Sequence, residues 1–290
     1  MTTIDAYPRA ATAATPIDGP ADGAADVPVR ATRARRRRRV PSWAVRSLSP
    51  LALLVLWQVG SQTGVITERV LPAPRLILAA AGETYGDGSL LAALQVSTAR
   101  VAIGFALGGS IGLVLGVLVG GSRILDHVVD PPLQMIRTIP FLGLIPLFIA
   151  WFGIGETPKI ALVALGVSFP LYLNASGAIR QVDPKLLETA QVLRFSPWQR
   201  ITVVVVPSAL PQVLVGLRQS LGIAWLSLIV AEQVNADSGL GYIINNARDA
   251  LRTDIVVFGL LLYALLGLTT DGIVRVLERW AVRWRPEAAR

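Results

Sequence analysis

A series of long apolar stretches separated by short charged segments constrains this chain of 290 residues most strongly. A helix that crosses a bilayer needs roughly 20 mainly apolar residues. Six stretches qualify, at about Ser47–Ile66, Thr98–Gly120, Leu133–Phe152, Thr157–Gly177, Ala209–Val230 and Ile255–Val276. Hydrophobic residues make up 53% of the chain, whereas soluble domains contain roughly 45–50%. The sequence therefore predicts an all-α polytopic membrane protein with six transmembrane helices, over residues 47–280.

The second stretch has glycine at every fourth position, which permits close approach of a neighbouring helix. These residues are Gly104, Gly108, Gly112, Gly116 and Gly120. Glycine is also common in membrane helices generally, so a specific packing seam and ordinary composition both remain open. The third and fourth stretches contain proline, which predicts kinked or locally unwound helices.

Basic residues exceed acidic ones, with 27 Lys and Arg against 19 Asp and Glu and a net charge of +8. An arginine-rich run over residues 30–40 is typical of nucleic-acid binding or of a segment beside a membrane. An apolar stretch begins only a few residues later, which favours contact with anionic lipid and argues against nucleic acid. Residues 1–46 are therefore expected to be a disordered basic cytoplasmic tail, and residues 281–290 a cytoplasmic C-terminal tail.

The distribution of Lys and Arg predicts the orientation. If the N-terminal tail is cytoplasmic, twenty basic residues lie in cytoplasmic segments, six lie on the opposite side and Arg218 lies inside the fifth stretch. Cytoplasmic segments carry the excess of Lys and Arg in membrane proteins. Both termini are therefore expected to be cytoplasmic.

The chain lacks the residues that several kinds of catalytic or metal site require. The chain has no cysteine and one histidine, so a thiolate or histidine-cluster metal site is excluded. No phosphate-binding G-x-x-x-x-G-K-[ST] loop and no hydrolase motif occurs. The chain is therefore expected to hold no metal or cofactor and to have no catalytic residues.

The segment from Asp183 to Pro211 is charged and amphipathic, although it lies between two apolar stretches. Asp183 followed by proline, and Ser196 followed by proline, each indicate a helix N-cap with proline in the first turn. The segment therefore predicts two short cytoplasmic helices joined by a turn near Arg194. Pro207 and Pro211 are expected to interrupt the approach to the fifth span.

Glu188-Thr189-Ala190, with Pro207 nineteen positions after Glu188, resembles the EAA signature of membrane permease subunits of bacterial ATP-binding-cassette (ABC) importers. That signature reads E-A-A, three residues, G, nine residues, I-x-L-P. Here Thr189 replaces alanine, valines replace the Ile and Leu, and Arg194 stands at the glycine position. The family glycine would suit a left-handed turn, and arginine with the same φ would cost roughly 1 kcal/mol.

The resemblance extends from about Leu51 to Pro286. Trp151–Asn174, Gly216–Trp225 and Val230–Asp249 resemble the aliphatic-sulfonate and taurine branch of that family, which also includes nitrate and bicarbonate permeases. The resemblance implies a permease subunit that forms the translocation path for a small organic anion. An aliphatic sulfonate is expected, with taurine, nitrate or bicarbonate as alternatives.

The resemblance also implies a location and partners. These are the bacterial cytoplasmic (inner) membrane and its lipid, a second copy of the permease, two cytoplasmic ATPase subunits that hold ATP and Mg²⁺, and an extracytoplasmic substrate-binding protein. Residues 183–207 would be the coupling segment that contacts the ATPase. Its expected residues are Glu188, Thr189, Ala190, Leu193, Arg194, Phe195 and Pro207. The alternative is an amphipathic helix that rests on the lipid surface.

Polar groups within or next to the spans are candidates for the translocation path or a gate, because such groups are costly in a membrane. The candidates are Asn174, Arg218 and Glu232. Arg218 could instead have a structural or headgroup-binding role. Glu232 is expected at the outer end, as a gate or a contact to the binding protein. Asp271 and Arg275, one turn apart, are expected to form an ion pair.

Two other classes of membrane protein are less consistent with the sequence. A stand-alone secondary transporter or channel predicts mid-membrane acidic or histidine relays and inverted repeats, and the sequence shows neither. A membrane scaffold without transport activity would leave the EAA-like spacing unexplained.

Overall fold

The computed structural model describes residues 42–234 and 236–282, and every regular element in these residues is a helix. The chain divides into two units, Met1–Ser47 and Leu48–Arg290. Most of the expected N-terminal tail, and residues 283–290 of the expected C-terminal tail, lie outside the described residues. The all-α class is confirmed.

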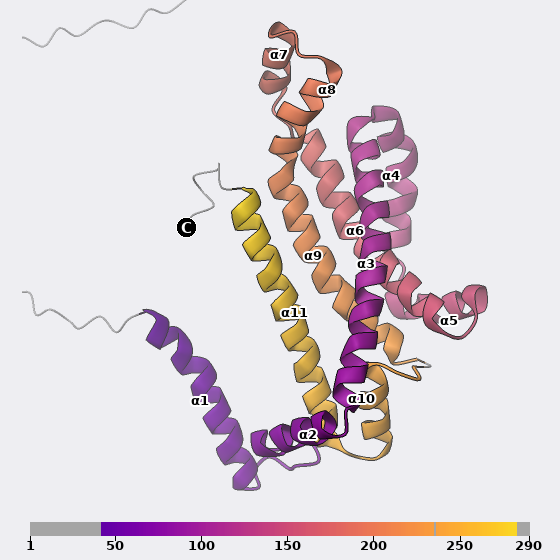
Figure 1. The fold of residues 1–290 in the computed structure, drawn as a ribbon. Helices are drawn as coiled ribbons and strands as arrows, with labels where there is room; N and C mark the ends of the chain where they lie inside the picture. Colours follow the sequence, from indigo (N-terminus) through magenta and orange to yellow (C-terminus); the bar gives the residue numbers. More distant parts are fainter. Residues whose placement is uncertain (1–41, 235, 283–290) are drawn as a thin grey trace, which may run out of the picture. The chain divides into compact units, whose positions relative to one another are not determined.

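Within the described residues, four helices are long and apolar enough to cross a membrane. They are α3 (Ser89–Gly121), α6 (Glu156–Arg180), α9 (Val206–Glu232) together with the residues just before it, and α11 (Thr253–Ala281). Shorter apolar segments lie in α1 (Ser42–Gln62) and α5 (Phe141–Phe152). The long helices run lengthwise beside one another (Figure 1).

The third expected span, Leu133–Phe152, is not one helix, so the number of six long spans is not reproduced in the described residues. The stretch is divided between α4 (Arg123–Arg137) and α5. Pro140 explains the break, because its ring removes a backbone donor and disfavours helical backbone at the preceding residue. The Thr138 hydroxyl donates to the Met135 carbonyl at 2.7 Å, within the last turn of α4.

The glycines of α3 form a packing seam against α6, which decides between the two interpretations left open by the sequence. A Cβ added at Gly108 would lie 2.0 Å from the Ala164 carbonyl oxygen, and one at Gly112 would lie 2.3 Å from that of Ser168. Even alanine would force the two helices apart at these contacts. The contact positions rise together along both helices, so α3 and α6 run in parallel.

The coupling segment joins α9 without the break that its prolines predict. α7 (Pro184–Val192) is followed by α8 (Pro197–Gln199), a π-helix η1 (Arg200–Val205) and then α9. The expected interruption at Pro207 and Pro211 is therefore wrong. A π-turn has wider hydrogen-bond spacing, which accommodates the missing N–H of Pro207 and the bulk of its ring.

Short helices lie at the two ends of the Leu48–Arg290 unit. α7 and α8 lie at one end, whereas α2 (Pro74–Gly86) and α10 (Leu240–Asp249) lie at the opposite end (Figure 1). Many large apolar side chains of the long helices are exposed, including Ile111 and Val114 on α3 and Leu265 and Leu268 on α11. Such surfaces fit a lipid environment.

Candidate functional site

The coupling segment is held in shape by local hydrogen bonds. The Asp183 carboxylate accepts from the backbone N–H of Lys185 at 2.9 Å, which caps α7. Ser196 and Gln199 exchange side-chain and backbone hydrogen bonds in a capping box at the start of α8. Both are N-caps that follow from the cap-and-proline pairs in the sequence, and each begins one of the two short helices.

The turn between α7 and α8 has left-handed backbone at Arg194, with φ of 56°. The N–H of Phe195 donates to the Ala190 carbonyl, and that of Arg194 donates to the Gln191 carbonyl, each at 2.9 Å. This pair of bonds defines a Schellman motif, which normally has glycine at the left-handed position. The left-handed backbone that the family glycine would suit is therefore present here, with arginine at that position.

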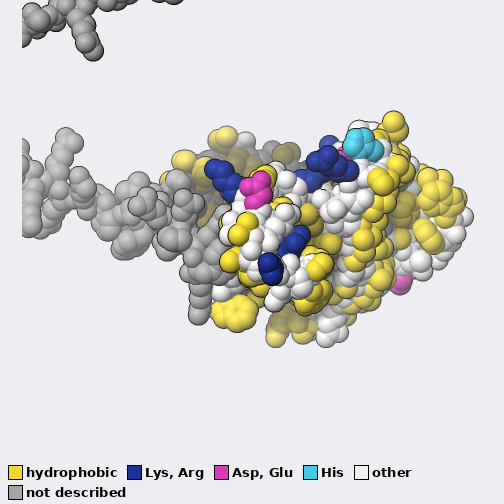
Figure 2. Space-filling view, turned by 90° about the horizontal axis from the view of Figure 1, so that it is seen from above, with side chains coloured by type: hydrophobic (Ala, Val, Ile, Leu, Met, Phe, Trp, Pro, Cys, Tyr) yellow, Lys and Arg dark blue, Asp and Glu magenta, His cyan; other side chains and the backbone are white. Residues whose placement is uncertain are grey.

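Apolar side chains of the coupling segment project outward. Val192 is 82% exposed, Trp198 72% and Leu193 61%, whereas Phe195 is half-buried and Ala190 is buried beneath the turn. Figure 2 looks onto the end of the unit that carries α7 and α8, where dark-blue Lys and Arg side chains lie among yellow apolar ones.

The expected polar coupling residues lie on the same segment. The Glu188 side chain is exposed and makes no hydrogen bond or ion pair within the described part of the chain. Thr189 is also exposed, and its hydroxyl donates to the Lys185 carbonyl at 2.7 Å. Pro207 lies in the first turn of α9. The seven expected coupling residues therefore belong to one continuous segment.

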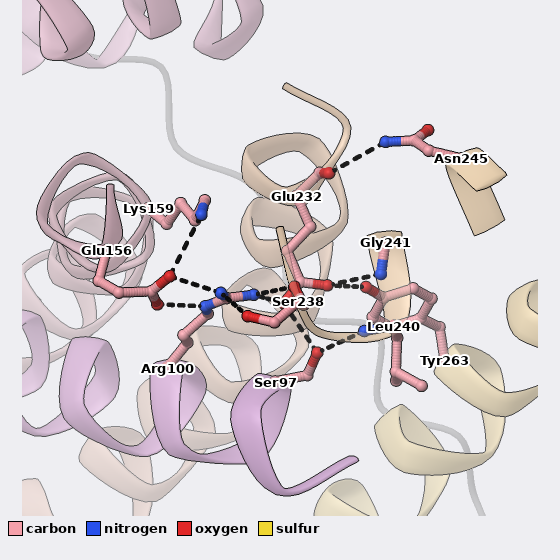
Figure 3. Close-up of polar contacts among 10 residues, drawn as sticks. All are labelled: Ser97, Arg100, Glu156, Lys159, Glu232, Ser238, Leu240, Gly241, Asn245 and Tyr263. Carbon is pink, nitrogen blue, oxygen red and sulfur yellow. Dashed lines mark hydrogen bonds and ion pairs between the residues drawn. The ribbon is translucent and has the colours of Figure 1, made fainter. Parts of the chain in front are cut away.

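A buried polar cluster lies at the opposite end of the unit, centred on Glu232 at the end of α9 (Figure 3). The Glu232 side chain is fully buried, and its two carboxylate oxygens accept four hydrogen bonds of 2.5–2.7 Å. The donors are Ser97 and Arg100 on α3, the Gly241 N–H on α10 and the Tyr263 hydroxyl on α11. One carboxylate thus joins four helices.

Arg100 is 2% exposed and uses all five of its guanidinium donors. It binds Glu156 in α6 through two parallel bonds of 2.5 and 2.6 Å, and Glu232 through one of 2.5 Å. The remaining two donors bind the carbonyl and hydroxyl of Ser238. Lys159, which is also buried, donates to Glu156 at 3.2 Å. Two cations therefore face two carboxylates. Glu232 is fully buried, whereas the Glu156 side chain is 54% exposed at the edge of the cluster.

Two glycines, one just before α10 and one in its first turn, let the backbone approach this cluster. Gly239 has φ of 98°, and a Cβ there would lie 2.5 Å from both Arg100 Nη1 and Glu232 Oε1. A Cβ at Gly241 would lie 2.3 Å from the Glu232 Cβ. Any larger residue at either position would therefore displace the cluster.

Sequence reasoning singled out Glu232 but missed its partner Arg100, which it counted only as a basic residue near the outer surface. The available signal was the spacing of Ser97 and Arg100, three residues apart on one helix face at the start of an apolar stretch. Their pairing with Glu232 spans more than 130 residues of sequence, so no local pattern encodes it.

Arg218 lies among acidic residues of α11. It donates to Glu278 at 2.5 Å, and its Nε lies 3.2 Å from Asp271. Asp271 also pairs with Arg275, so the ion pair expected from the sequence is confirmed. The charge of Arg218 is thus balanced within its own chain.

Asn174 belongs to a row of carboxamides between α6 and α9. It donates to the Pro170 carbonyl at 2.8 Å and to the Gln219 side chain at 3.0 Å. It accepts from the Gln212 side chain at 2.7 Å. Asn174 is half-buried, whereas both glutamines are exposed.

An exposed ion pair lies outside the spans, at the same end as the buried cluster. Arg252 contacts Glu83 of α2 at 2.7 Å and Asp254 at 2.9 Å. The hydrogen bond and the positive charge of Arg252 lower the pKa of Glu83 below its usual value. This pair connects the end of α2 to the start of α11.

Residues 108–283 match the family described as binding-protein-dependent transport system inner membrane component, which is more than half of the chain. The chain belongs to this family of transport-system permeases. Its long apolar helices and the resemblance of its EAA-like segment agree with that membership.

Two curated relatives differ in their sequence identity to this permease. SsuC of Bacillus subtilis (strain 168), named for aliphatic sulfonates transport, is 45% identical over 88% of this chain and 92% of its own length. The taurine transport system permease protein TauC of Escherichia coli (strain K12) is 32% identical over 83% of this chain and 90% of its own length. Both alignments cover most of each chain.

The fold of this permease resembles a chain in a crystal structure of an amino acid ABC transporter. The TM-score is 0.56 at 19% sequence identity, over 69% of this chain and 97% of that chain. This likeness concerns the fold alone. The family match and the relatives identify the chain as a permease subunit of an ABC importer. The described residues contain no cluster of acidic or histidine side chains suited to a metal ion.

Proposed function

We propose that this permease imports aliphatic sulfonates. The observation that carries the substrate class is the 45% identity to a permease named for aliphatic sulfonates, against 32% to one named for taurine. Two copies would form the translocation path. Two cytoplasmic ATPase subunits would bind and hydrolyse ATP with Mg²⁺, and an extracytoplasmic protein would deliver the substrate.

The coupling segment, residues 183–207, would dock on the ATPase. Exposed Leu193 and half-buried Phe195 supply apolar contacts, and exposed Glu188 supplies a charge that has no partner in the described part of the chain. The capped helices and the Schellman turn give the segment a defined shape. Because α8 continues through η1 into α9, a force on the turn would reach a spanning helix directly.

The orientation follows from this docking. The C-terminal end of α11 lies at the same end of the unit as α7 and α8, which supports a cytoplasmic C-terminus (Figure 1). The arginine-rich run before α1 supports a cytoplasmic N-terminus. The cluster around Glu232 would then lie at the outer end, where it would hold α3, α9, α10 and α11 together as one part of the gate. The ion pairs of Arg218 favour its structural role.

Uptake in a strain that lacks this permease gene tests the substrate. Cells complemented with the wild-type gene should accumulate isotope-labelled alkanesulfonates, and cells with an empty vector should not. Taurine, nitrate and bicarbonate are measured in parallel. Restored uptake of one of these anions without any alkanesulfonate uptake would assign the permease to the alternative substrate. No uptake of any of them would refute the proposed substrate class.

A further inference from the structure

A groove lies where α4 gives way to α5, beside α6 and α9. Its volume is 310 Å³, at the lower end of the roughly 300–1,000 Å³ typical of small-molecule sites. The break at residues 138–140 allows Ile136 and Ile139 to line one side of it. The groove is separate from the coupling segment and from the cluster around Glu232.

The wall of the groove is apolar except at two residues. Leu165, Phe169 and Leu173 of α6 and Ile223 of α9 supply alkyl and aromatic surface. The polar exceptions are Arg137 at the end of α4 and Gln219 on α9. This composition suits a ligand with an alkyl portion and one polar group.

Hydrogen bonding by Asn174 sets the orientation of Gln219. A backbone carbonyl can only accept, so the atom of Asn174 that lies 2.8 Å from the Pro170 oxygen is its amide nitrogen. The same nitrogen donates to Gln219, so the atom of Gln219 that faces it is the carbonyl oxygen. The NH₂ of Gln219 is left without an acceptor among the residues that the structure describes. Gln219 therefore offers donors, which bind anions.

Arg137 differs from Arg180 on α6 and Arg218 on α9. Arg180 pairs with Asp126, and Arg218 pairs with Glu278 and Asp271. Arg137 is exposed and makes no ion pair with any residue in the described ranges. Arg123, at the start of α4, is exposed and makes no ion pair within the described residues either, but it does not line the groove. A guanidinium binds an oxyanion through two parallel hydrogen bonds, which are stronger than bonds between neutral groups.

We propose that this groove binds the transported anion inside the permease, as an alkyl oxyanion of the sulfonate class. The alkyl chain lies along Leu165, Phe169, Leu173 and Ile223, and the oxyanion receives hydrogen bonds from Arg137 and the Gln219 NH₂. Asn174 acts as a positioning residue because it turns that NH₂ outward. The inference rests on the proposed sulfonate import and deepens it, since the permease would then select substrates in addition to the binding protein.

The test uses the full transporter, reconstituted in proteoliposomes with its ATPase and one substrate-binding protein. Initial uptake is measured for methanesulfonate and hexanesulfonate, together with ATP hydrolysis. Arg137→Gln should lower uptake of both sulfonates at least tenfold, because a hydrogen bond to a charged group is lost. Arg123→Gln is the matched control. It removes the same charge from α4 at a residue that does not line the groove, and it should retain wild-type uptake.

Sulfonates with alkyl chains of different length test the apolar wall of the groove. Ile223→Trp fills part of the groove and should lower hexanesulfonate uptake at least tenfold relative to methanesulfonate uptake. The same binding protein is used throughout. A change in the ratio of hexanesulfonate to methanesulfonate uptake is therefore caused by the permease. Asn174→Leu should raise the apparent KM for hexanesulfonate several-fold while the maximal rate is kept. A purely structural defect would instead lower the maximal rate.

The outcomes separate the inference from the function on which it rests. If the wild-type transporter imports no alkanesulfonate, the proposed function and the groove site both fail. If it imports them but Arg137→Gln and Ile223→Trp keep the wild-type profile, only the groove site fails. Equal loss for both chain lengths in Ile223→Trp also overturns the inference. It would show that the groove packs against lipid or a second copy, and loss of the dimer on size-exclusion chromatography would identify the second copy.

Discussion

The two ends of the Leu48–Arg290 unit differ in which side chains are buried and which are exposed. Around Glu232, the charged side chains of Glu232, Arg100 and Lys159 are buried, and every donor of Arg100 is used within the chain. On the coupling segment, Glu188 is exposed, and large apolar side chains such as Val192 and Trp198 project outward. One end satisfies its own side chains, and the other presents side chains to its surroundings.

This difference supports the proposal that the end around Glu232 is rigid and that the coupling segment binds a partner. A buried charge must be paired within the fold, so the residues around Glu232 can hardly be separated without a large cost. Exposed apolar groups on a short segment contribute little to the fold and mark an interaction surface. If an ATPase docks on α7 and α8, its movement would thus be transmitted to the long helices. The opposite ends of these helices are held together by the hydrogen bonds around Glu232.

The largest expected effect comes from removing the charge at the buried end. Glu232→Gln leaves Arg100 with one carboxylate fewer and places an amide among four donors, which should cost roughly 3–5 kcal/mol. The apparent Tm of the purified protein in detergent should fall by at least about 6 °C. Glu188→Gln is the same substitution at the exposed end and should leave Tm unchanged. Equal shifts in the two variants would remove the contrast between the ends.

The next effect concerns the ATPase and not the stability of the fold. Phe195→Asp or Glu188→Lys should weaken docking about a hundredfold, because an unpaired charge would enter the interface. The measurements are co-purification of the ATPase and ATP hydrolysis stimulated by loaded binding protein. Phe195→Leu is the conservative control and should keep most of both signals. Wild-type retention and stimulation in both charged variants would mean that the segment is only an interfacial helix.

A smaller effect is expected at the turn of the coupling segment. Arg194→Gly should stabilise the protein by about 1 kcal/mol, because glycine adopts the φ of 56° without the steric cost of a Cβ. Arg200→Gly should act in the opposite direction, since Arg200 has right-handed helical backbone with φ of −60°. Thermal unfolding of the two variants gives the comparison. Destabilisation by both would show that the arginine side chain matters more than the turn.

The smallest effect should come from the exposed pair near the buried cluster. The pKa of Glu83 is lowered by Arg252, so any stabilisation by the ionised carboxylate is present above its ordinary value of 4.5 and lost as pH falls. Glu83→Gln should shift Tm less than any destabilising variant above, because the pair is exposed. The shift should vanish in acid. A shift as large as that of Glu232→Gln would mean that location, and not burial, determines the cost.

Local patterns in the sequence predicted the coupling segment in detail. The cap-and-proline pairs at Asp183 and Ser196 predicted both short helices and a turn near Arg194. The left-handed backbone of Arg194 came from the structure, and the family glycine had suggested it only as a condition. The same kind of reasoning failed at Pro207, because proline removes a hydrogen bond wherever it occurs but its neighbours determine how the helix adapts. Here the π-helix η1 accommodates Pro207, and the helix continues into α9.

The sequence alone determined the features that depend on neighbouring residues or on total apolar length. These are the helical class, the membrane environment, the caps and the EAA-like spacing. The tertiary structure decided which of two interpretations applied to the glycines of α3, and it paired Arg100 with Glu232 and Asn174 with Gln219. Such pairings join residues far apart in the chain. Their free energy depends on burial and geometry that exist only once the helices have packed.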